Sequence, residues 1–100
     1  PLESESVDLV VSGQTLEHVK NPFRLVADMV RVLKKDGYII LIAPSTGRRH
    51  DDLDCWRFMD DSFKAIAEEV GLTVVADWMT KSGYEERSLH WHGHTFVGKK

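Results

Sequence analysis

The sequence VDLVVSGQTLEHVKNP over residues 7–22, followed by VLKKDGYIILIAP over residues 32–44, decides the fold. The first of these opens with a short, β-branched and almost entirely apolar run, as expected of a strand that is covered on both faces. Asn21 can cap a helix, Pro22 suits the first helical position, and apolar residues then recur at helical spacing. Gly37–Ser45 is a second apolar, β-rich run. Strand, helix and strand in this order predict a right-handed parallel βαβ unit.

The remainder of the chain predicts a second helix and two further strands. Phe63–Val70 has its apolar residues on one helical face. Leu72–Met79 and Leu89–Val97 have the composition of strands, with the polar turn Lys81–Arg87 between them, and we expect the last strand to be antiparallel to its neighbour. No repeat, low-complexity tract or linker divides the sequence. Residues 1–100 are therefore expected to form a single domain.

Composition excludes several classes of protein. The chain is 42% hydrophobic and 29% charged, with a formal charge of −3 and no basic stripe, so nucleic acid is not an expected partner. Its longest apolar run, Tyr38–Ala43, is far too short to cross a bilayer, so no membrane association is expected. A single cysteine, Cys55, excludes an internal disulfide framework and fits the reducing cytoplasm, where we expect the protein to be located.

These residues, in this order, resemble class I, S-adenosylmethionine-dependent methyltransferases of the type 11 group. Residues 7–22 are similar to the family's fourth strand and the "LEH-V" loop after it. The turn at Gly37 is similar to "L-K-P-G-G", with Lys35 and Asp36 in place of Pro and the first Gly. The sequence HDDLDCWRFMDDSFKAIAEEVGL over residues 50–72 resembles the "H-x-x-x-W-R-F/Y" segment of members that act on small molecules and sugars.

The resemblance implies an α/β fold that is the C-terminal part of the Rossmann-like methyltransferase domain. This part is a mixed sheet of about four strands in the family order 4-5-7-6, with the last strand antiparallel and helices packed on it. S-adenosylmethionine is the implied cofactor. The Gly-rich loop that would hold it elsewhere in the family is not found among these residues.

Three residues after the first strand are implied to face the methyl donor. Gly13 would let the backbone approach the cofactor, and Gln14 and Thr15 follow it at the carboxyl edge of the sheet, where open α/β sheets bind ligands. In the alternative interpretation, Gly13 is a glycine because a tight turn requires its backbone angles.

Glu17 and His18 form the pair most suggestive of chemistry. His18 can accept a proton near neutral pH, which predicts a catalytic base for methyl transfer to oxygen or nitrogen. The alternative is a hydrogen-bonded histidine that ties the loop to the sheet. The resemblance also leaves open a divalent metal on Glu17 and His18, but two ligands alone make a weak site, so no metal is predicted.

The segment after the second strand is implied to lie over the substrate pocket. There, His50, Trp56 and Arg57 are predicted to bind substrate, with Arg57 pairing with a carboxylate or phosphate and Trp56 forming an apolar wall. Alternatively, Trp56 and Phe58 cover the core while Arg57 bonds to backbone carbonyls.

Alternating histidines near the C-terminus share one face of the last predicted strand: His90, His92 and His94. Such a face could bind a metal, but a solvated or half-buried face is the favoured interpretation.

Two functional hypotheses follow. In the first, the chain is the substrate-side portion of a methyltransferase that acts on a small-molecule or sugar acceptor. In the second, it is a catalytically inactive, truncated methyltransferase-like domain that self-associates. For either, the exposed first strand Val7–Ser12 predicts a homodimer or higher oligomer. A third, remote alternative is an unrelated two-layer α/β domain with a metal on the terminal histidines.

Overall fold

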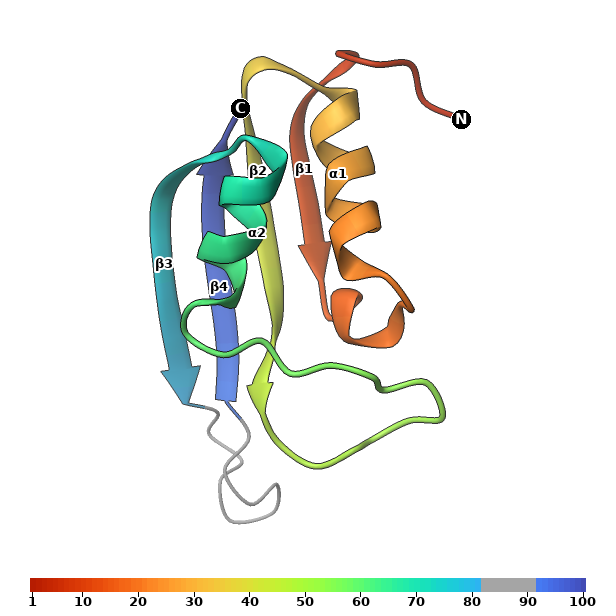
Figure 1. Cartoon of the computed structure of the whole chain (residues 1–100), viewed down its shortest axis with the longest axis vertical. Coiled ribbons are helices and arrows are strands. Elements are labelled where there is room, and N and C mark those ends of the chain that lie inside the picture. Colours follow the sequence, from red (N-terminus) through yellow and green to blue (C-terminus); the bar gives the residue numbers. More distant parts are fainter. Residues whose placement is uncertain (82–91) are drawn as a thin grey trace.

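The computed structural model describes residues 1–81 and 92–100. Figure 1 shows a sheet with helices packed on it. Two predicted segments fall outside the described residues. They are the predicted turn from its second residue on, 82–87, and residues 89–91 of the predicted last strand, which include His90. Along the chain the elements are β1 (Val7–Gly13), the 3₁₀ helix η1 (Leu16–His18), α1 (Pro22–Val32), β2 (Leu33–Thr46), α2 (Ser62–Val70), β3 (Thr73–Lys81) and β4 (His92–Lys99).

The four strands form one mixed sheet in the order β1-β2-β4-β3. β1 runs parallel to β2, whereas β4 lies between β2 and β3 and is antiparallel to both. The βαβ unit and the antiparallel last strand are therefore confirmed. The strands β1, β2, β3 and β4 correspond to the family's strands four, five, six and seven. The observed order is therefore the predicted 4-5-7-6 arrangement.

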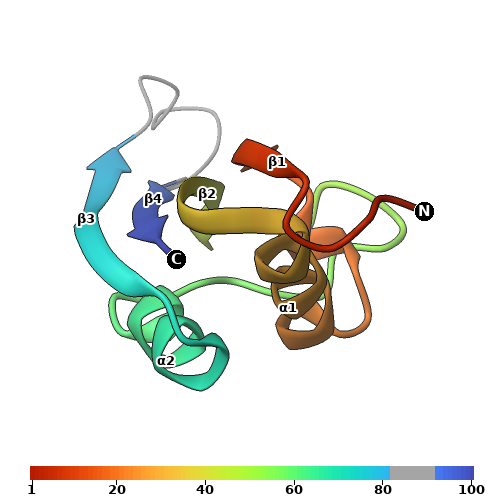
Figure 2. The same ribbon diagram turned by 90° about the horizontal axis from the view of Figure 1, so that it is seen from above.

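Both helices pack on the same face of the sheet (Figure 2). The side chain of Asn21 caps α1 as predicted, because its Oδ1 accepts a hydrogen bond from the Arg24 N–H at 3.0 Å. α2 ends at Gly71, which takes the left-handed conformation with a φ of 82°. The core between sheet and helices includes Leu16, Val26, Leu33, Ile39, Leu41, Phe58, Phe63, Ile66 and Phe96.

Backbone crowding explains the turn into the body of β2, which begins at Leu33 rather than at Gly37 as predicted. A Cβ atom on Gly37 would lie 2.8 Å from the carbonyl oxygen of Lys34 and 3.0 Å from that of Asp8. Asp36, the residue before it, has a φ of 69°, in the left-handed region. The turn therefore requires glycine at position 37 and imposes strain at position 36.

The carboxyl ends of β1 and β2 lie at the same end of the sheet, at the bottom of Figure 1. η1 follows β1 there, and the long irregular segment 47–58 follows β2. Segments that are distant in the sequence therefore meet at the edge where open α/β sheets bind ligands.

Candidate functional site

The loop after β1 is exposed over Gly13, Gln14 and Thr15. The Gln14 N–H donates to the carbonyl of Ile42 at 2.8 Å, which continues the ladder between β1 and β2. Gln14, not Gly13, takes the left-handed conformation, with a φ of 52°. A Cβ atom on Gly13 would meet nothing within 4 Å. The interpretation in which a tight turn demands glycine at position 13 is therefore wrong, and the space beside Gly13 is open.

Segment 47–58 is bound to η1 through main-chain contacts. The carbonyl of Glu17 accepts hydrogen bonds from the N–H groups of Cys55, at 2.7 Å, and Trp56, at 3.3 Å. The His18 ring bonds through Nδ1 to the carbonyl of Leu53. His18 is therefore a hydrogen-bonded histidine, as the structural alternative expects, but it ties η1 to segment 47–58 rather than to the sheet. Its Nε2 lies on the other side of the ring.

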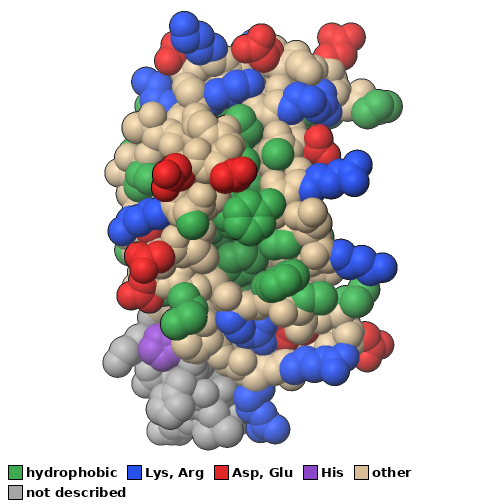
Figure 3. Space-filling model, viewed as in Figure 1, with side chains coloured by type: hydrophobic (Ala, Val, Ile, Leu, Met, Phe, Trp, Pro, Cys, Tyr) green, Lys and Arg blue, Asp and Glu red, His purple; other side chains and the backbone are tan. Residues whose placement is uncertain are grey.

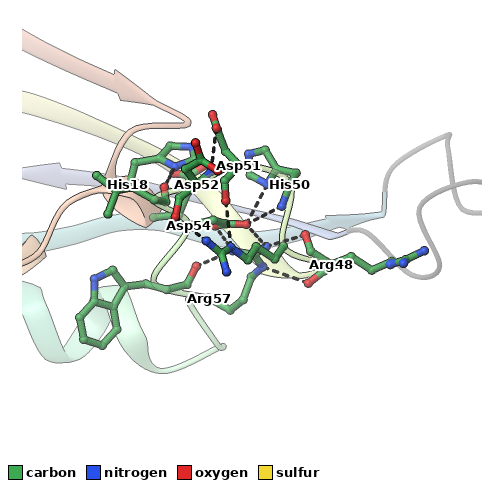
Figure 4. Close-up of polar contacts among 12 residues, drawn as sticks. His18, Arg48, His50, Asp51, Asp52, Asp54 and Arg57 are labelled. Carbon is green, nitrogen blue, oxygen red and sulfur yellow. Dashed lines mark hydrogen bonds and ion pairs between the residues drawn. The ribbon is translucent and has the colours of Figure 1, made fainter.

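Asp54 organises the middle of segment 47–58 (Figure 4). Its carboxylate has no solvent exposure and accepts two bonds from Arg57, Nη1 to Oδ1 at 2.5 Å and Nη2 to Oδ2 at 2.7 Å. Oδ2 also lies 3.0 Å from both the N–H and the ring Nδ1 of His50. The hydrogen bonds from Arg57 hold the pKa of Asp54 well below its ordinary value, with smaller contributions from His50.

Arg57 directs its remaining N–H groups to the backbone. Nε donates to the Gly47 carbonyl at 3.2 Å, Nη2 to Arg48 at 2.8 Å and Nη1 to Trp56 at 2.7 Å. With the two bonds to Asp54, each of the five guanidinium N–H groups has an acceptor. These contacts match the interpretation in which Arg57 bonds to backbone carbonyls, and its role in substrate binding stays a prediction.

Glu17, His18 and His50 meet beside this network. The two imidazole rings are 5.1 Å apart between centroids, in an edge-to-face arrangement. The side chain of Glu17 is fully buried, and its Oε2 lies 3.7 Å from His18 Nε2. The structure thus brings the predicted catalytic residue His18 and the predicted substrate-binding residue His50 together, although they come from different loops.

Trp56 lies on the helical side of the molecule, beside residues of α1 and α2. Its Nε1 donates to the Val19 carbonyl at 2.7 Å, and its ring is 43% exposed. It lines a hollow of about 440 Å³ together with Phe23 and Ile66. Figure 3 shows hydrophobic side chains gathered between α1 and α2, with charged groups at the sides. Phe58, by contrast, is buried and covers the core, as the alternative for this segment expects.

His94 is part of the core rather than of an open face. It is 1% exposed, its Nδ1 lies 2.9 Å from the Phe58 carbonyl, and its Nε2 lies 2.5 Å from Asp77 Oδ1. Since both ring nitrogens are bonded within the protein, His94 does not serve the alternative of a metal on the terminal histidines. His92 is half-buried, and His90 is outside the described residues.

Sequence reasoning missed Asp54 and the buried state of Glu17. The spacing of Asp54 between His50 and Arg57 is a signal that could have revealed an ion pair within the loop. Nothing in the sequence marks Glu17 as buried, because a glutamate beside a histidine is normally solvated.

Comparison with known proteins agrees with this fold. Residues 1–41 match the family described as "Methyltransferase domain". The biotin biosynthesis bifunctional protein BioHC of Teredinibacter turnerae is 30% identical over 87 residues, which are 76% of this chain and 15% of that protein. The [4+2]-cyclase SpnF has a TM-score of 0.79 at 13% identity, over 100% of this chain and 52% of the other. A SAM-dependent methyltransferase of Methanosarcina mazei has a TM-score of 0.76 at 14% identity, over 99% and 61% respectively.

The chain has the class I, S-adenosylmethionine-dependent methyltransferase fold, so the predicted resemblance is confirmed. It spans between half and two thirds of these two solved structures, and a much smaller share of BioHC. None of the helices in the described part of the chain has the length and apolar character needed to cross a membrane.

Proposed function

We propose that this chain forms the acceptor-side part of an S-adenosylmethionine-dependent methyltransferase whose acceptor is a small molecule or a sugar. The observation that supports this proposal most is that two groups of residues lie near each other at the carboxyl edge of the sheet. These are the loop Gly13–Thr15 and the histidine pair His18 and His50. In a fold shared with methyltransferases, this edge is where donor and acceptor would be aligned.

The residues after β1 fit the approach of a cofactor. Gly13 leaves open space where any other residue would place a side chain. The side chains of Gln14 and Thr15 are exposed beside it, and Thr15 Oγ1 donates to the Gly13 carbonyl at 3.1 Å. The cofactor would supply a methyl group on a sulfonium, which is reactive without covalent help from the protein. The loop Gly13–Thr15 would hold part of the cofactor. The Gly-rich loop that holds another part in the family is not found in this sequence.

His18 is the residue that would move a proton. A carbonyl can only accept a hydrogen bond, so the bond to Leu53 keeps the proton of the neutral ring on Nδ1. Nε2 then carries the lone pair and can take a proton from an acceptor hydroxyl or amine. His50, with a side chain that is 42% exposed, lies beside it and would contact the acceptor. A cytoplasmic location belongs to this proposal, and the free cysteine Cys55 fits a reducing compartment.

Transfer of a labelled methyl group tests the proposal. The protein that carries this sequence is incubated with S-adenosylmethionine labelled on the methyl group and a panel of small hydroxyl and amine acceptors, including sugars. We expect at least one labelled product, and in His18→Asn a fall in kcat of about 100-fold with little change in KM for the donor. His92→Asn, a histidine on β4, is the control. No product with any acceptor, or equal rates in wild type and His18→Asn, would contradict the proposal.

A second candidate function is self-association without catalysis. β1 lies at an edge of the sheet formed by the described strands, and its side chains Leu9 and Val11 are 53% and 59% exposed. An unpaired edge with apolar side chains favours pairing with another chain. We propose that a second copy of this chain pairs with β1.

A further inference from the structure

Glu17 carries a buried charge that the main-chain network does not satisfy. Its side chain has no solvent exposure, and neither carboxylate oxygen has a hydrogen-bond partner among the described residues. The 3.7 Å that separate Oε2 from His18 Nε2 exceed a hydrogen-bond length. Its charge also interacts with Arg57, but the N–H groups of that guanidinium are directed at other acceptors. A carboxylate buried in this way is costly unless a hydrogen bond or a metal ion compensates it.

Two imidazole rings offer their nitrogens to the same place. Glu17, His18 and His50 each present one potential ligand atom, and these atoms all lie within 4.8 Å of one another. Figure 4 shows His18 and His50 within one cluster with Asp54, and their ring centroids are 5.1 Å apart. The three residues come from η1 and from segment 47–58, so the site exists only in the folded chain.

Both rings are oriented as metal-binding histidines are. Nδ1 of His18 is bonded to the Leu53 carbonyl, and Nδ1 of His50 lies 3.0 Å from the Asp54 carboxylate. A carbonyl only accepts hydrogen bonds, so the His18 ring keeps its proton on Nδ1 and leaves Nε2 as the nitrogen that can coordinate. The His50 ring has an ionised carboxylate beside it. This pairing of a ligating ring with a carbonyl or carboxylate behind it is the usual support of a metal-bound histidine.

We propose that Glu17, His18 and His50 bind a divalent transition-metal cation. Two imidazoles and one carboxylate suit zinc and its neighbours, and three protein ligands leave a position for water or an acceptor atom. Ligand atoms bound at about 2.0–2.2 Å from one tetrahedral ion lie about 3.4 Å apart, so ligand atoms that are now up to 4.8 Å apart need to draw together by up to about 1.4 Å. The exposed ring of His50 has the room to do so.

This inference does not rest on the proposed methyl transfer. Because both roles use Nε2 of His18, a bound cation would replace the free base and would hold the acceptor atom itself. The two proposals are tested by different readouts, since metal binding is measured without donor or acceptor.

Titration of the tag-free, metal-free chain with Co²⁺ and with Zn²⁺ tests the site. We expect one equivalent of Co²⁺ to give visible absorption bands, Zn²⁺ to displace it, and calorimetry with Zn²⁺ to give a one-to-one complex. In Glu17→Gln, which keeps the size of the side chain, we expect affinity to fall at least about 100-fold, beyond the loss that follows from changing an outer partner. Glu69→Gln, which changes an exposed carboxylate on α2 in the same way, is the matched control and should bind as the wild type does.

A second variant distinguishes the loss of a metal ligand from misfolding. His50→Ala removes an exposed ring and should keep the circular dichroism spectrum of the wild type while losing the same affinity. Zn²⁺ should raise the Tm of the wild type and leave that of both ligand variants unchanged. Absence of Co²⁺ bands at one equivalent, or equal affinity in the wild type and folded Glu17→Gln, would overturn the proposal.

Discussion

Arg57 holds Asp54 in a bidentate pair only three residues away along the chain, with nitrogen–oxygen distances of 2.5 and 2.7 Å. The same guanidinium bonds to the carbonyls of Gly47 and Arg48, so one side chain closes the segment on itself. The pair is shielded on the Asp54 side, which is why it is stronger than a solvent-exposed ion pair.

Replacement of Asp54 by Asn should destabilise the chain. The variant keeps the shape but loses the charged acceptor for Arg57 and His50, so we expect the free energy of unfolding at pH 7 to fall by about 2 kcal/mol. The folded-state pKa of Asp54 is lowered, so its contribution is present above about pH 4 and is lost as the pH falls below that value. Urea unfolding in EDTA at several pH values measures this. The difference between the two proteins should shrink in acid, and Asp60→Asn, an exposed control, should show no difference.

Asp36→Gly should stabilise the turn before β2. Asp36 has a φ of 69°, where glycine is unstrained, and the variant loses only an exposed ion pair to Lys99 with a nitrogen–oxygen distance of 3.9 Å. We expect a gain of about 0.5 kcal/mol in thermal or chemical unfolding. Gly37→Ala, one position further, should cost about 2 kcal/mol because its Cβ would overlap two carbonyl oxygens. Equal effects of both substitutions would contradict this description of the turn.

His94→Ala should be among the most destabilising substitutions in β4. It removes a buried ring that packs on Phe63 at 4.4 Å between centroids, together with the bonds to Phe58 and Asp77. We expect a loss of about 3 kcal/mol by denaturant unfolding. Thr95→Ala, at a half-buried position on the other face of the strand, should cost much less. A loss below about 1 kcal/mol in His94→Ala would show that the ring is not part of the core.

The proposed self-association through β1 makes a prediction about mass in solution. The chain should sediment as a dimer at high protein concentration, and Val11→Lys should shift it to a monomer because the charge lies on the pairing edge. Val75→Lys, at a similarly exposed position on β3 at the opposite edge, should leave the dimer intact. A wild-type chain that stays monomeric over the whole concentration range would refute the pairing.

Local patterns predicted the elements well because each has a clear period and clear ends. The apolar runs gave the strands, Asn21 and Pro22 gave the start of α1, and the family resemblance gave the strand order. The start of β2 was placed too late, since the polar residues Lys34 to Asp36 do not have the apolar pattern of a strand.

The candidate site was predictable only in part. The residues after β1 could be expected at a ligand-binding edge from the parallel βαβ unit alone. The contact between His18 and His50 could not, because segment 47–58 is irregular and its path depends on hydrogen bonds to Glu17. The left-handed residue of the first loop was also misplaced, because glycine is the usual choice there and the chain uses Gln14.

Segment 47–58 is held mainly by backbone acceptors, with Asp54 and Arg57 as the side chains that close it. Its shape is therefore largely independent of exposed side chains such as those of Arg48, Asp52 and Leu53. A library randomised at those positions would keep one scaffold while presenting many chemistries to a ligand. The same separation gives evolution a way to exchange specificity at this edge without rebuilding the sheet beneath it.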